Sequence, residues 1–339
     1  MKRNFNLLLS LCFLFNLVSI SLNGQVKIDS YFGRWSLYLP GGAGWLEVHQ
    51  ETNYPDASLL WYGGSVLPVD DVYMDGEKLV VTQINKVVRK KDIMGNPVRT
   101  HTLTNLYTFE LKGVTEMNGV AVMPRQDGGS ERIKFMGKMI PDLPAPPDMT
   151  KISYGKPIEL FNGKDLSGWE IMEKGRQNGF QAVNGVLVNN PVQKEGEPHI
   201  NYGNLRTKKE FEDFNLKLDV NVPAGSNSGI YLRGIYEIQV LDSYGLPLDS
   251  HNMGAVYSRI APSVSAEKPA GEWQTFDITL YKRYVTILLN GVKIIDNAPL
   301  LGVTGGAISA DEFKQGPIYL QGDHGTIMYR NIVLTPIIE

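Results

Sequence analysis

Short runs of alternating apolar and polar residues, separated by turn signals, are the feature that most constrains how this chain can fold. In residues 273–281 apolar and polar residues alternate, which places Phe276, Ile278 and Leu280 on one face of a strand. Residues 285–290 and 292–295 are expected to form a hairpin around Asn290-Gly291, a dipeptide that favours the positive φ of a tight turn. Beyond residue 24 no long run has a helical period, so we expect an all-β protein.

A proline-rich segment divides the chain. Residues 141–149 contain four prolines, which cannot continue a sheet and favour an extended spacer. We therefore expect a linker at residues 141–153, between an N-terminal domain of residues 25–140 and a C-terminal domain of residues 154–339. The N-terminal segment has short strands and glycine turns, which indicate a smaller β-barrel or β-sandwich domain. Three tryptophans are expected in its core, because large aromatic side chains are mostly buried: Trp35, Trp45 and Trp61.

The first 24 residues have the layout of a secretory signal peptide. Lys2 and Arg3 precede the apolar residues 5–22, and a short polar stretch follows. An uncleaved membrane anchor is the alternative, since the run is near the minimum length of a spanning helix. Cleavage predicts a secreted protein, periplasmic or associated with the cell surface, without stable membrane insertion. It also removes Cys12, the only cysteine, so the mature chain would have no disulfide.

Charge and motifs exclude several classes of function. The formal net charge is −3 and the basic residues are scattered, so no nucleic-acid partner is expected. No phosphate-binding loop, Gly-x-Ser-x-Gly elbow or His-Glu-x-x-His motif occurs, which excludes the corresponding nucleotide, serine hydrolase and zinc sites. The sequence leaves the oligomeric state open.

Several motifs of the C-terminal segment occur in a recognisable order. They are LFNGKDLSGW at 160–169, GSNSGIYLR at 225–233, YEIQVLD at 236–242 and GPIYLQGDHG at 316–325. In this order they resemble the 3-keto-disaccharide hydrolase family. The resemblance implies a concanavalin A-like jelly-roll sandwich and a glycoside substrate already oxidised to a ketone at sugar carbon 3. It does not extend to residues 25–145.

One predicted hairpin supplies most candidate site residues. A three-residue loop at residues 234–236 places Arg233 opposite Glu237. Tyr231 then lies opposite Gln239, and all four side chains share one face. A two-residue loop would bury Glu237 among aliphatic side chains, so we favour the first register. It predicts a polar patch on the face where such sandwiches bind sugars.

Cleavage of a 3-keto-glycoside requires a base for the acidified hydrogen on carbon 2, a partner for the enolate oxygen and an acid for the leaving group. His324 is the first candidate for base or acid, because histidine titrates near neutrality. Arg233 is the candidate for the enolate oxygen, with Glu237 or Asp242 in the remaining role. The side chains expected to contact an oligosaccharide or glycoside are Tyr231, Gln239, Tyr257, Trp273 and Gln321.

Other interpretations of the same residues stay open. Laminarinase-type glucanases carry Glu-x-Asp-x-x-Glu, and residues 237–242 have that spacing, but Gln239 and Asp242 replace the last two carboxylates of the pattern. A retaining glycosidase needs two carboxyl groups at about 5–5.5 Å. The shorter side chain of Asp242 would displace the acid and Gln239 removes the middle charge, so this mechanism is disfavoured. A non-catalytic carbohydrate-binding protein would use the same scaffold. No cofactor or metal site is predicted, although Asp242 and Asp323 could hold a structural calcium ion.

Overall fold

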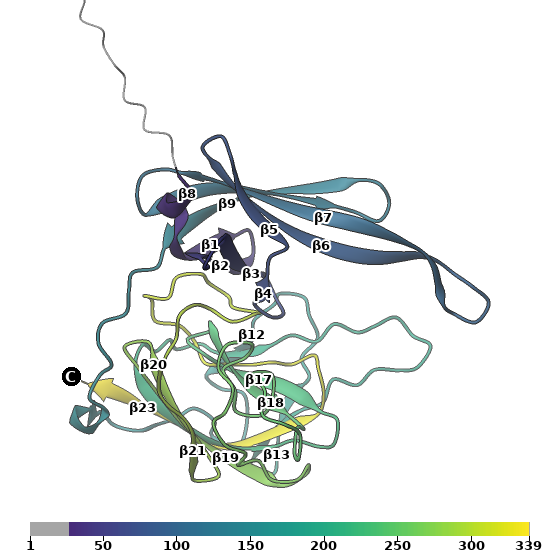
Figure 1. Cartoon of the computed structure of the whole chain (residues 1–339). Helices are drawn as coiled ribbons and strands as arrows, with labels where there is room; N and C mark the ends of the chain where they lie inside the picture. Colours follow the sequence, from purple (N-terminus) through teal and green to yellow (C-terminus); the bar gives the residue numbers. More distant parts are fainter. Residues whose placement is uncertain (1–26, 339) are drawn as a thin grey trace, which may run out of the picture.

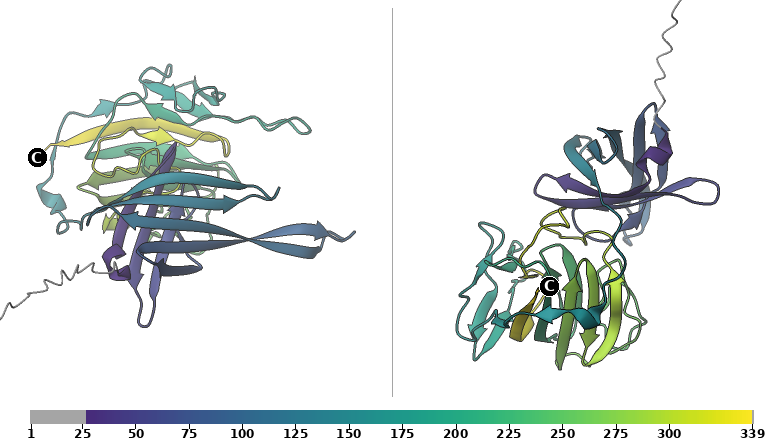
Figure 2. Two further views of the ribbon diagram at one scale, coloured as in Figure 1. Left: turned by 90° about the horizontal axis from the view of Figure 1, so that it is seen from above. Right: turned by 90° about the vertical axis from the view of Figure 1, so that its left-hand side faces the viewer.

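The chain forms two β-sheet bodies stacked on each other (Figures 1 and 2). The computed structural model describes residues 27–338, which contain strands and two short 3-10 helices, η1 (Ile28–Tyr31) and η2 (Met149–Lys151), but no α-helix. The expected signal peptide and Cys12 lie outside the described residues. Within residues 27–338 no helix has the length and apolar character needed to cross a membrane.

The N-terminal body is one antiparallel sheet of nine strands in the order β4-β3-β2-β1-β9-β8-β7-β6-β5. Its strands are β1 (Gly33–Leu39), β2 (Gly42–Gln50), β3 (Pro55–Trp61), β4 (Leu67–Pro68), β5 (Asp71–Asp75), β6 (Lys78–Lys91), β7 (Pro97–Leu111), β8 (Glu116–Pro124) and β9 (Ser130–Met139). The sheet curls, because the Val69 N–H after β4 donates to Ala57 O of β3 and the Asp70 N–H donates to Thr82 O of β6. The ends of β6 and β7 project as an arm (Figure 1).

The three tryptophans of this body have different surroundings. Trp35 is completely buried in the core of the curled sheet, as expected. Trp61 is half-buried and meets Tyr107 edge-on, with ring centroids 4.9 Å apart. Trp45 is also buried, but it packs in the hydrophobic cluster of the C-terminal body. This tryptophan therefore joins the two bodies.

The C-terminal body is a sandwich of two antiparallel sheets. The larger sheet holds nine strands: β10 (Ser153–Tyr154), β11 (Ile158–Glu159), β13 (Phe180–Val183), β14 (Val186–Asn189), β16 (Phe214–Asn221), β19 (Trp273–Tyr281), β20 (Tyr284–Leu289), β21 (Val292–Pro299) and β23 (Ile327–Ile338). The smaller sheet has the order β12-β15-β22-β17-β18, with β12 (Trp169–Ile171), β15 (Leu205–Thr207), β22 (Tyr319–Leu320), β17 (Asn227–Leu232) and β18 (Tyr236–Leu241). Apolar side chains of both sheets share one core. This architecture confirms the all-β jelly-roll expectation.

Local sequence patterns hold in the larger sheet. Phe276, Ile278 and Leu280 of β19 are completely buried, so the alternation has the expected inward face. Asn290 and Gly291 form the turn between β20 and β21, with φ of 53° and 81°. A turn with two positive φ angles matches the right-handed twist of a hairpin.

The segment between the two bodies contains no strand from β9 to β10. It is fastened to the sandwich at two places: Tyr284 Oη donates to Pro144 O at 2.8 Å, and Asn297 Nδ2 donates to Pro147 O at 3.1 Å. The proposed domain limits on either side of this linker stay a prediction.

Candidate functional site

A polar pocket of about 320 Å³ lies on the face of the smaller sheet that points away from the sandwich core. Its walls come from β17, β18, three loops of the C-terminal body and one loop of the N-terminal sheet. The lining residues are Gly63, Gly64, Asn227, Tyr231, Glu237, Gln239, Tyr257, Gly305, Gly306, Gln321 and His324. A larger cavity of about 490 Å³ lies near Gln177 and Tyr202, but its lining has no carboxylate or imidazole. We therefore take the first pocket as the candidate site.

The pairing of β17 with β18 gathers the polar side chains. Tyr231 pairs with Glu237, and Gly229 pairs with Gln239. Since side chains alternate between the faces of a strand, these odd-numbered residues face the pocket while Ile230 faces the core. A side chain at Gly229 would collide with Glu237 Oε1, so the glycine makes room for the carboxyl.

Glu237 is an almost completely buried carboxyl, with 4% of its surface exposed. Its backbone N–H donates to Thr304 Oγ1 at 2.8 Å. Burial raises the pKa of Glu237 to about 8, against the smaller opposite effect of the hydrogen bond from Tyr231. A carboxyl with such a pKa keeps its proton at neutral pH and can act as a general acid.

The hydroxyl of Tyr231 lies between Glu237 and a backbone carbonyl of the pocket. Tyr231 Oη lies 2.7 Å from Glu237 Oε2 and 2.8 Å from Gly305 O, and both of these atoms are acceptors when the carboxyl is ionised. A phenol has one proton to donate. If Glu237 is protonated, it donates to Tyr231 while Tyr231 donates to Gly305 O. Tyr231 is held in place by stacking on Tyr319, with ring centroids 3.8 Å apart.

Two buried acceptors of the pocket have no partner within the described residues. Gln239 Nε2 donates to His251 O at 3.1 Å, which leaves Gln239 Oε1 without a hydrogen bond. Asn227 Oδ1 is likewise buried and unpaired. Because buried polar atoms normally have partners, these two oxygens are suited to accept hydrogen bonds from ligand hydroxyls. Asn227 was not among the sequence candidates, although its odd position on the strand of Tyr231 is the signal that could have found it.

The remaining polar groups come from loops. Gln321 and His324 follow β22, and His324 is exposed at the edge of the pocket. Tyr257 lies in the loop after β18, where its N–H donates to Glu237 O at 3.0 Å. The pocket thus combines a buried carboxyl, an accessible imidazole and several neutral hydrogen-bonding groups. This set can move protons on a neutral, hydroxyl-rich ligand.

Comparison with known proteins identifies the family. The profile described as the 3-keto-alpha-glucoside-1,2-lyase-like domain matches residues 156–335. This chain belongs to the 3-keto-alpha-glucoside-1,2-lyase-like family. The match confirms the resemblance that the ordered motifs indicated.

Individual proteins that are similar to this chain share less than a third of the aligned residues with it. A curated 3-keto-disaccharide hydrolase of Bacteroides thetaiotaomicron is 27% identical over 172 residues, which cover 41% of this chain and 57% of the relative. The chain therefore spans little more than half of that relative. Two solved structures from Parabacteroides distasonis, named as proposed glycosyl hydrolases, are 31% and 22% identical, with TM-scores of 0.43 and 0.44. They cover 56% and 54% of this chain, and 92% and 94% of their own chains.

In this lyase-like domain, six of the nine sequence candidates line the pocket: Tyr231, Glu237, Gln239, Tyr257, Gln321 and His324. Arg233 does not. It lies in the turn between β17 and β18 with φ of 54°, and its guanidinium donates to Glu312 O at 2.6 Å and to Lys314 O at 2.9 Å. The predicted position opposite Glu237 is wrong, because the loop consists of residues 233–235.

Two further candidates lie outside the pocket. Asp242 follows β18 and accepts a hydrogen bond from the Gly225 N–H at 2.9 Å. Trp273 begins β19 in the other sheet, with the Arg330 guanidinium 3.9 Å from its ring centroid. Asp323, considered with Asp242 as a calcium ligand, accepts a hydrogen bond from the Tyr202 N–H at 2.9 Å.

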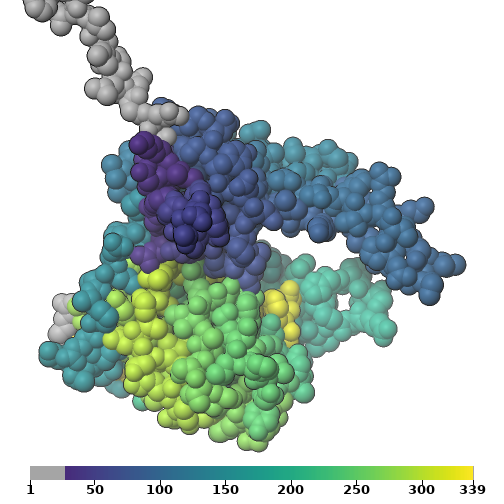
Figure 3. Space-filling view, in the orientation of Figure 1, coloured from purple at the N-terminus to yellow at the C-terminus, as the bar shows by residue number. Residues whose placement is uncertain are grey.

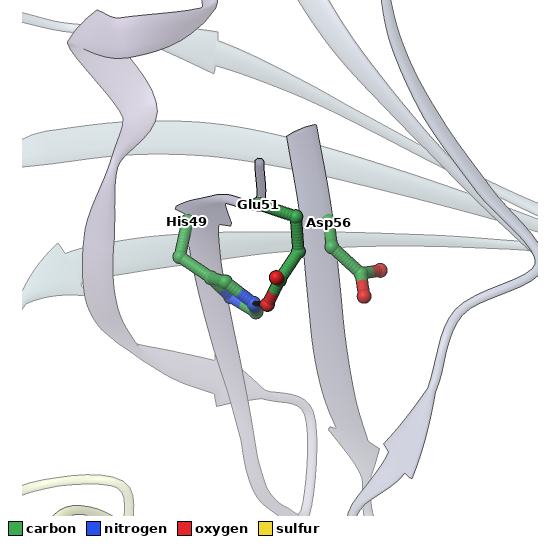
Figure 4. Close-up of side chains that lie close together, drawn as sticks. All are labelled: His49, Glu51 and Asp56. Atoms are coloured by element: carbon green, nitrogen blue, oxygen red, sulfur yellow. Dashed lines mark hydrogen bonds and ion pairs between the residues drawn. The ribbon is translucent and has the colours of Figure 1, made fainter. Parts of the chain in front are cut away.

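A separate acidic cluster lies on the N-terminal sheet (Figure 4). His49, Glu51 and Asp56 each offer one potential ligand atom, and these atoms lie within 4.8 Å of one another. His49 Nε2 is 3.1 Å from Glu51 Oε1, and both side chains are more than one-third exposed. Exposed clusters of this kind are common on protein surfaces, so we assign it no role.

Proposed function

We propose that this protein is an exported enzyme that cleaves 3-keto-glycosides by removal of the carbon-2 proton, elimination of the leaving group and addition of water. The observation that carries the proposal is a buried carboxyl with a pKa of about 8, Glu237, in the same pocket as His324. The name of the curated relative supports the substrate class. Export rests on the pattern of the first 24 residues.

Each proposed step assigns one proton. His324 removes the hydrogen from carbon 2, and the electron pair forms an enolate with the carbon-3 ketone. The enolate collapses to a double bond between carbons 1 and 2 as the bond from carbon 1 to the leaving oxygen breaks, and Glu237 protonates that oxygen. Water then adds at carbon 1 and gives its proton to Glu237, while His324 returns a proton to carbon 2. The sum is hydrolysis.

The enolate oxygen needs a donor in place of Arg233. Asn227 and Gln321 line the pocket, and each carries an amide NH₂ group. Such preoriented donors stabilise negative charge that develops in the transition state. We propose these two amides for that role. Gln239 Oε1 accepts a sugar hydroxyl and fixes the orientation of the ring.

The test measures aglycone release by residues 25–339 from a 3-keto-β-glucoside and from the unoxidised glucoside. The wild type is expected to release aglycone from the keto sugar alone. Glu237→Gln and His324→Ala are each expected to lose about 10²-fold or more in kcat, as for other general acids and bases. Asp242→Asn is the matched control outside the pocket and should keep full activity.

Two outcomes would contradict the proposal. Release from the unoxidised glucoside would indicate direct glycoside hydrolysis. Binding of the keto sugar without turnover, with equal affinity in the wild type and in His324→Ala, would indicate a non-catalytic carbohydrate-binding protein instead.

A further inference from the structure

The loop between β3 and β4 belongs to the N-terminal sheet but borders the pocket of the C-terminal body. Gly63 and Gly64 line the pocket on one side, and Gly305 and Gly306 line it next to them. A side chain at Gly305 would collide with Gly64 O, so the two backbones meet at a distance that only glycine permits. Tyr231 Oη donates to Gly305 O, which places this contact beside Glu237.

Hydrogen bonds on both sides of these glycines fasten the loop to the pocket. The Gly306 N–H donates to Tyr62 O at 3.2 Å, and the Val66 N–H donates to Ser258 Oγ at 2.9 Å. Tyr62 and Ser258 have φ of 65° and 59°. Positive φ costs free energy in residues other than glycine and persists where the surroundings enforce it. Tyr62 and Ser258 thus keep an unfavourable backbone conformation at the positions where the loop and the C-terminal body are hydrogen-bonded.

A third contact connects the loop to a side chain of the pocket. Ser65 Oγ lies 2.9 Å from His251 Nε2, and His251 Nδ1 lies 2.6 Å from Asp249 Oδ1. The His251 ring meets the Tyr257 ring edge-on, with centroids 5.0 Å apart. Because Tyr257 lines the pocket, the position of the loop and the position of this pocket side chain are coupled.

The position of the loop is also fixed by the interface between the two bodies, which are in contact (Figure 3). Trp45 is 2% exposed and packs in the hydrophobic cluster that includes Leu300 and Val303. Its Nε1 donates to Leu301 O at 2.9 Å, and the Arg259 guanidinium lies 4.3 Å from its ring centroid. A buried aromatic anchor of this kind fixes the orientation of two bodies.

We propose that the β3–β4 loop, residues 62–66, is a wall of the sugar site and decides which glycosides enter it. The loop closes one end of the polar face of the smaller sheet beside Glu237, so the site accepts the terminal keto sugar of a short glycoside and not the interior of a polymer. A pocket of about 320 Å³ is at the small end of the range of about 300–1,000 Å³ for ligand sites, which agrees with one or two sugar rings. This inference rests on the proposed function.

Gly63→Trp is the direct test. A Cβ at Gly63 would have no atom within 4 Å, and the φ of Gly63 is not positive, so a side chain enters open space at the pocket without backbone strain. We expect kcat/KM for a keto-disaccharide to fall about tenfold or more, mainly through KM. Binding of the same sugar to a Glu237→Gln background should weaken equally. Leu67→Trp is the matched control, because Leu67 is 53% exposed and lies outside the pocket.

Ser65→Ala provides a second variant that adds no bulk. Loss of the contact with His251 should raise KM several-fold while kcat and the melting temperature stay near the wild-type values. Unchanged KM in Ser65→Ala and Gly63→Trp, with an active wild type, would overturn the inference and leave the proposed function intact.

The opposite combination separates the two proposals. If the wild type binds a keto sugar without cleaving it, and Gly63→Trp abolishes that binding, the loop is a wall of the site although the proposed function fails. A wild-type protein that neither binds nor cleaves any of these sugars would overturn both.

Discussion

At the scale of single residues, Glu237 illustrates how position decides the chemistry of a carboxyl group. In water a glutamate is a base at neutral pH, whereas burial raises the pKa of Glu237 to about 8. The hydrogen bond from Tyr231 lowers the pKa of Glu237, but this effect is smaller than that of burial. The same residue that suits a nucleophile in a two-carboxylate glycosidase is here suited to donate a proton.

The raised pKa predicts that stability depends on pH. Glu237 titrates near 8 when folded but near 4.5 when unfolded. Between these values the folded chain holds one more proton on Glu237, so the stability linked to this group is fully present below about pH 4.5 and is lost as the pH rises through about 8. The free energy of unfolding should fall by up to about 1.4 kcal/mol per pH unit in this window. Glu237→Gln cannot ionise and should remove this slope.

Urea unfolding of the wild type and Glu237→Gln at several pH values measures the effect. Glu272→Gln, at an exposed glutamate, is the control and should keep the wild-type slope. An equal pH dependence in all three proteins would mean that Glu237 ionises freely in the folded state.

At the scale of elements, the β17–β18 hairpin separates what the sequence could predict from what it could not. Glu237 pairs with Tyr231 and not with Arg233, so the observed register is shifted by two residues from the predicted one. Tyr231, Glu237 and Gln239 nevertheless face the pocket as expected. A polar pattern of period two determines the faces of a strand, but registers that differ by two residues satisfy it equally. The loop decides between them, and a left-handed backbone at Arg233 leaves no signal in the sequence.

Contacts between distant elements were also beyond the sequence. Strand patterns and the Asn290-Gly291 turn are local, and the structure confirms them. Trp45, by contrast, has the same hydrophobic signal as Trp35, although one joins the two bodies and the other fills the core of its own sheet. The contribution of Gly63 to the pocket likewise depends on a domain arrangement that no local pattern encodes.

The corrected position of Arg233 predicts a structural effect of its removal. Arg233→Met loses the charged hydrogen bonds to Glu312 O and Lys314 O, the first of which is buried. The free energy of unfolding should fall by about 3 kcal/mol. The kcat of the folded fraction should stay near that of the wild type, and kcat and unfolding measured on the same sample test both statements. A large loss of kcat at unchanged stability would instead indicate that Arg233 has a role in catalysis.

At the scale of the whole molecule, the site is made by two bodies that are stacked as well as linked. The linker is hydrogen-bonded to the sandwich, and Trp45 packs across the interface close to the residues that precede Gly305. A rigid interface is needed because a loop carried by one body can select ligands in the other only if their relative position is fixed. The stability of the interface and the affinity for substrate should therefore change together.

Trp45→Ala tests this coupling. It removes a buried indole and should lower the free energy of unfolding by about 3–5 kcal/mol. Since the loop then loses its support, KM for the keto-glycoside should rise as well. Val48→Ala is the matched control: Val48 lies on the same strand, is 1% exposed and packs in the core of the N-terminal sheet. It should cost about 2 kcal/mol and leave KM unchanged. Equal KM in both variants would mean that the interface stabilises the chain without shaping the site.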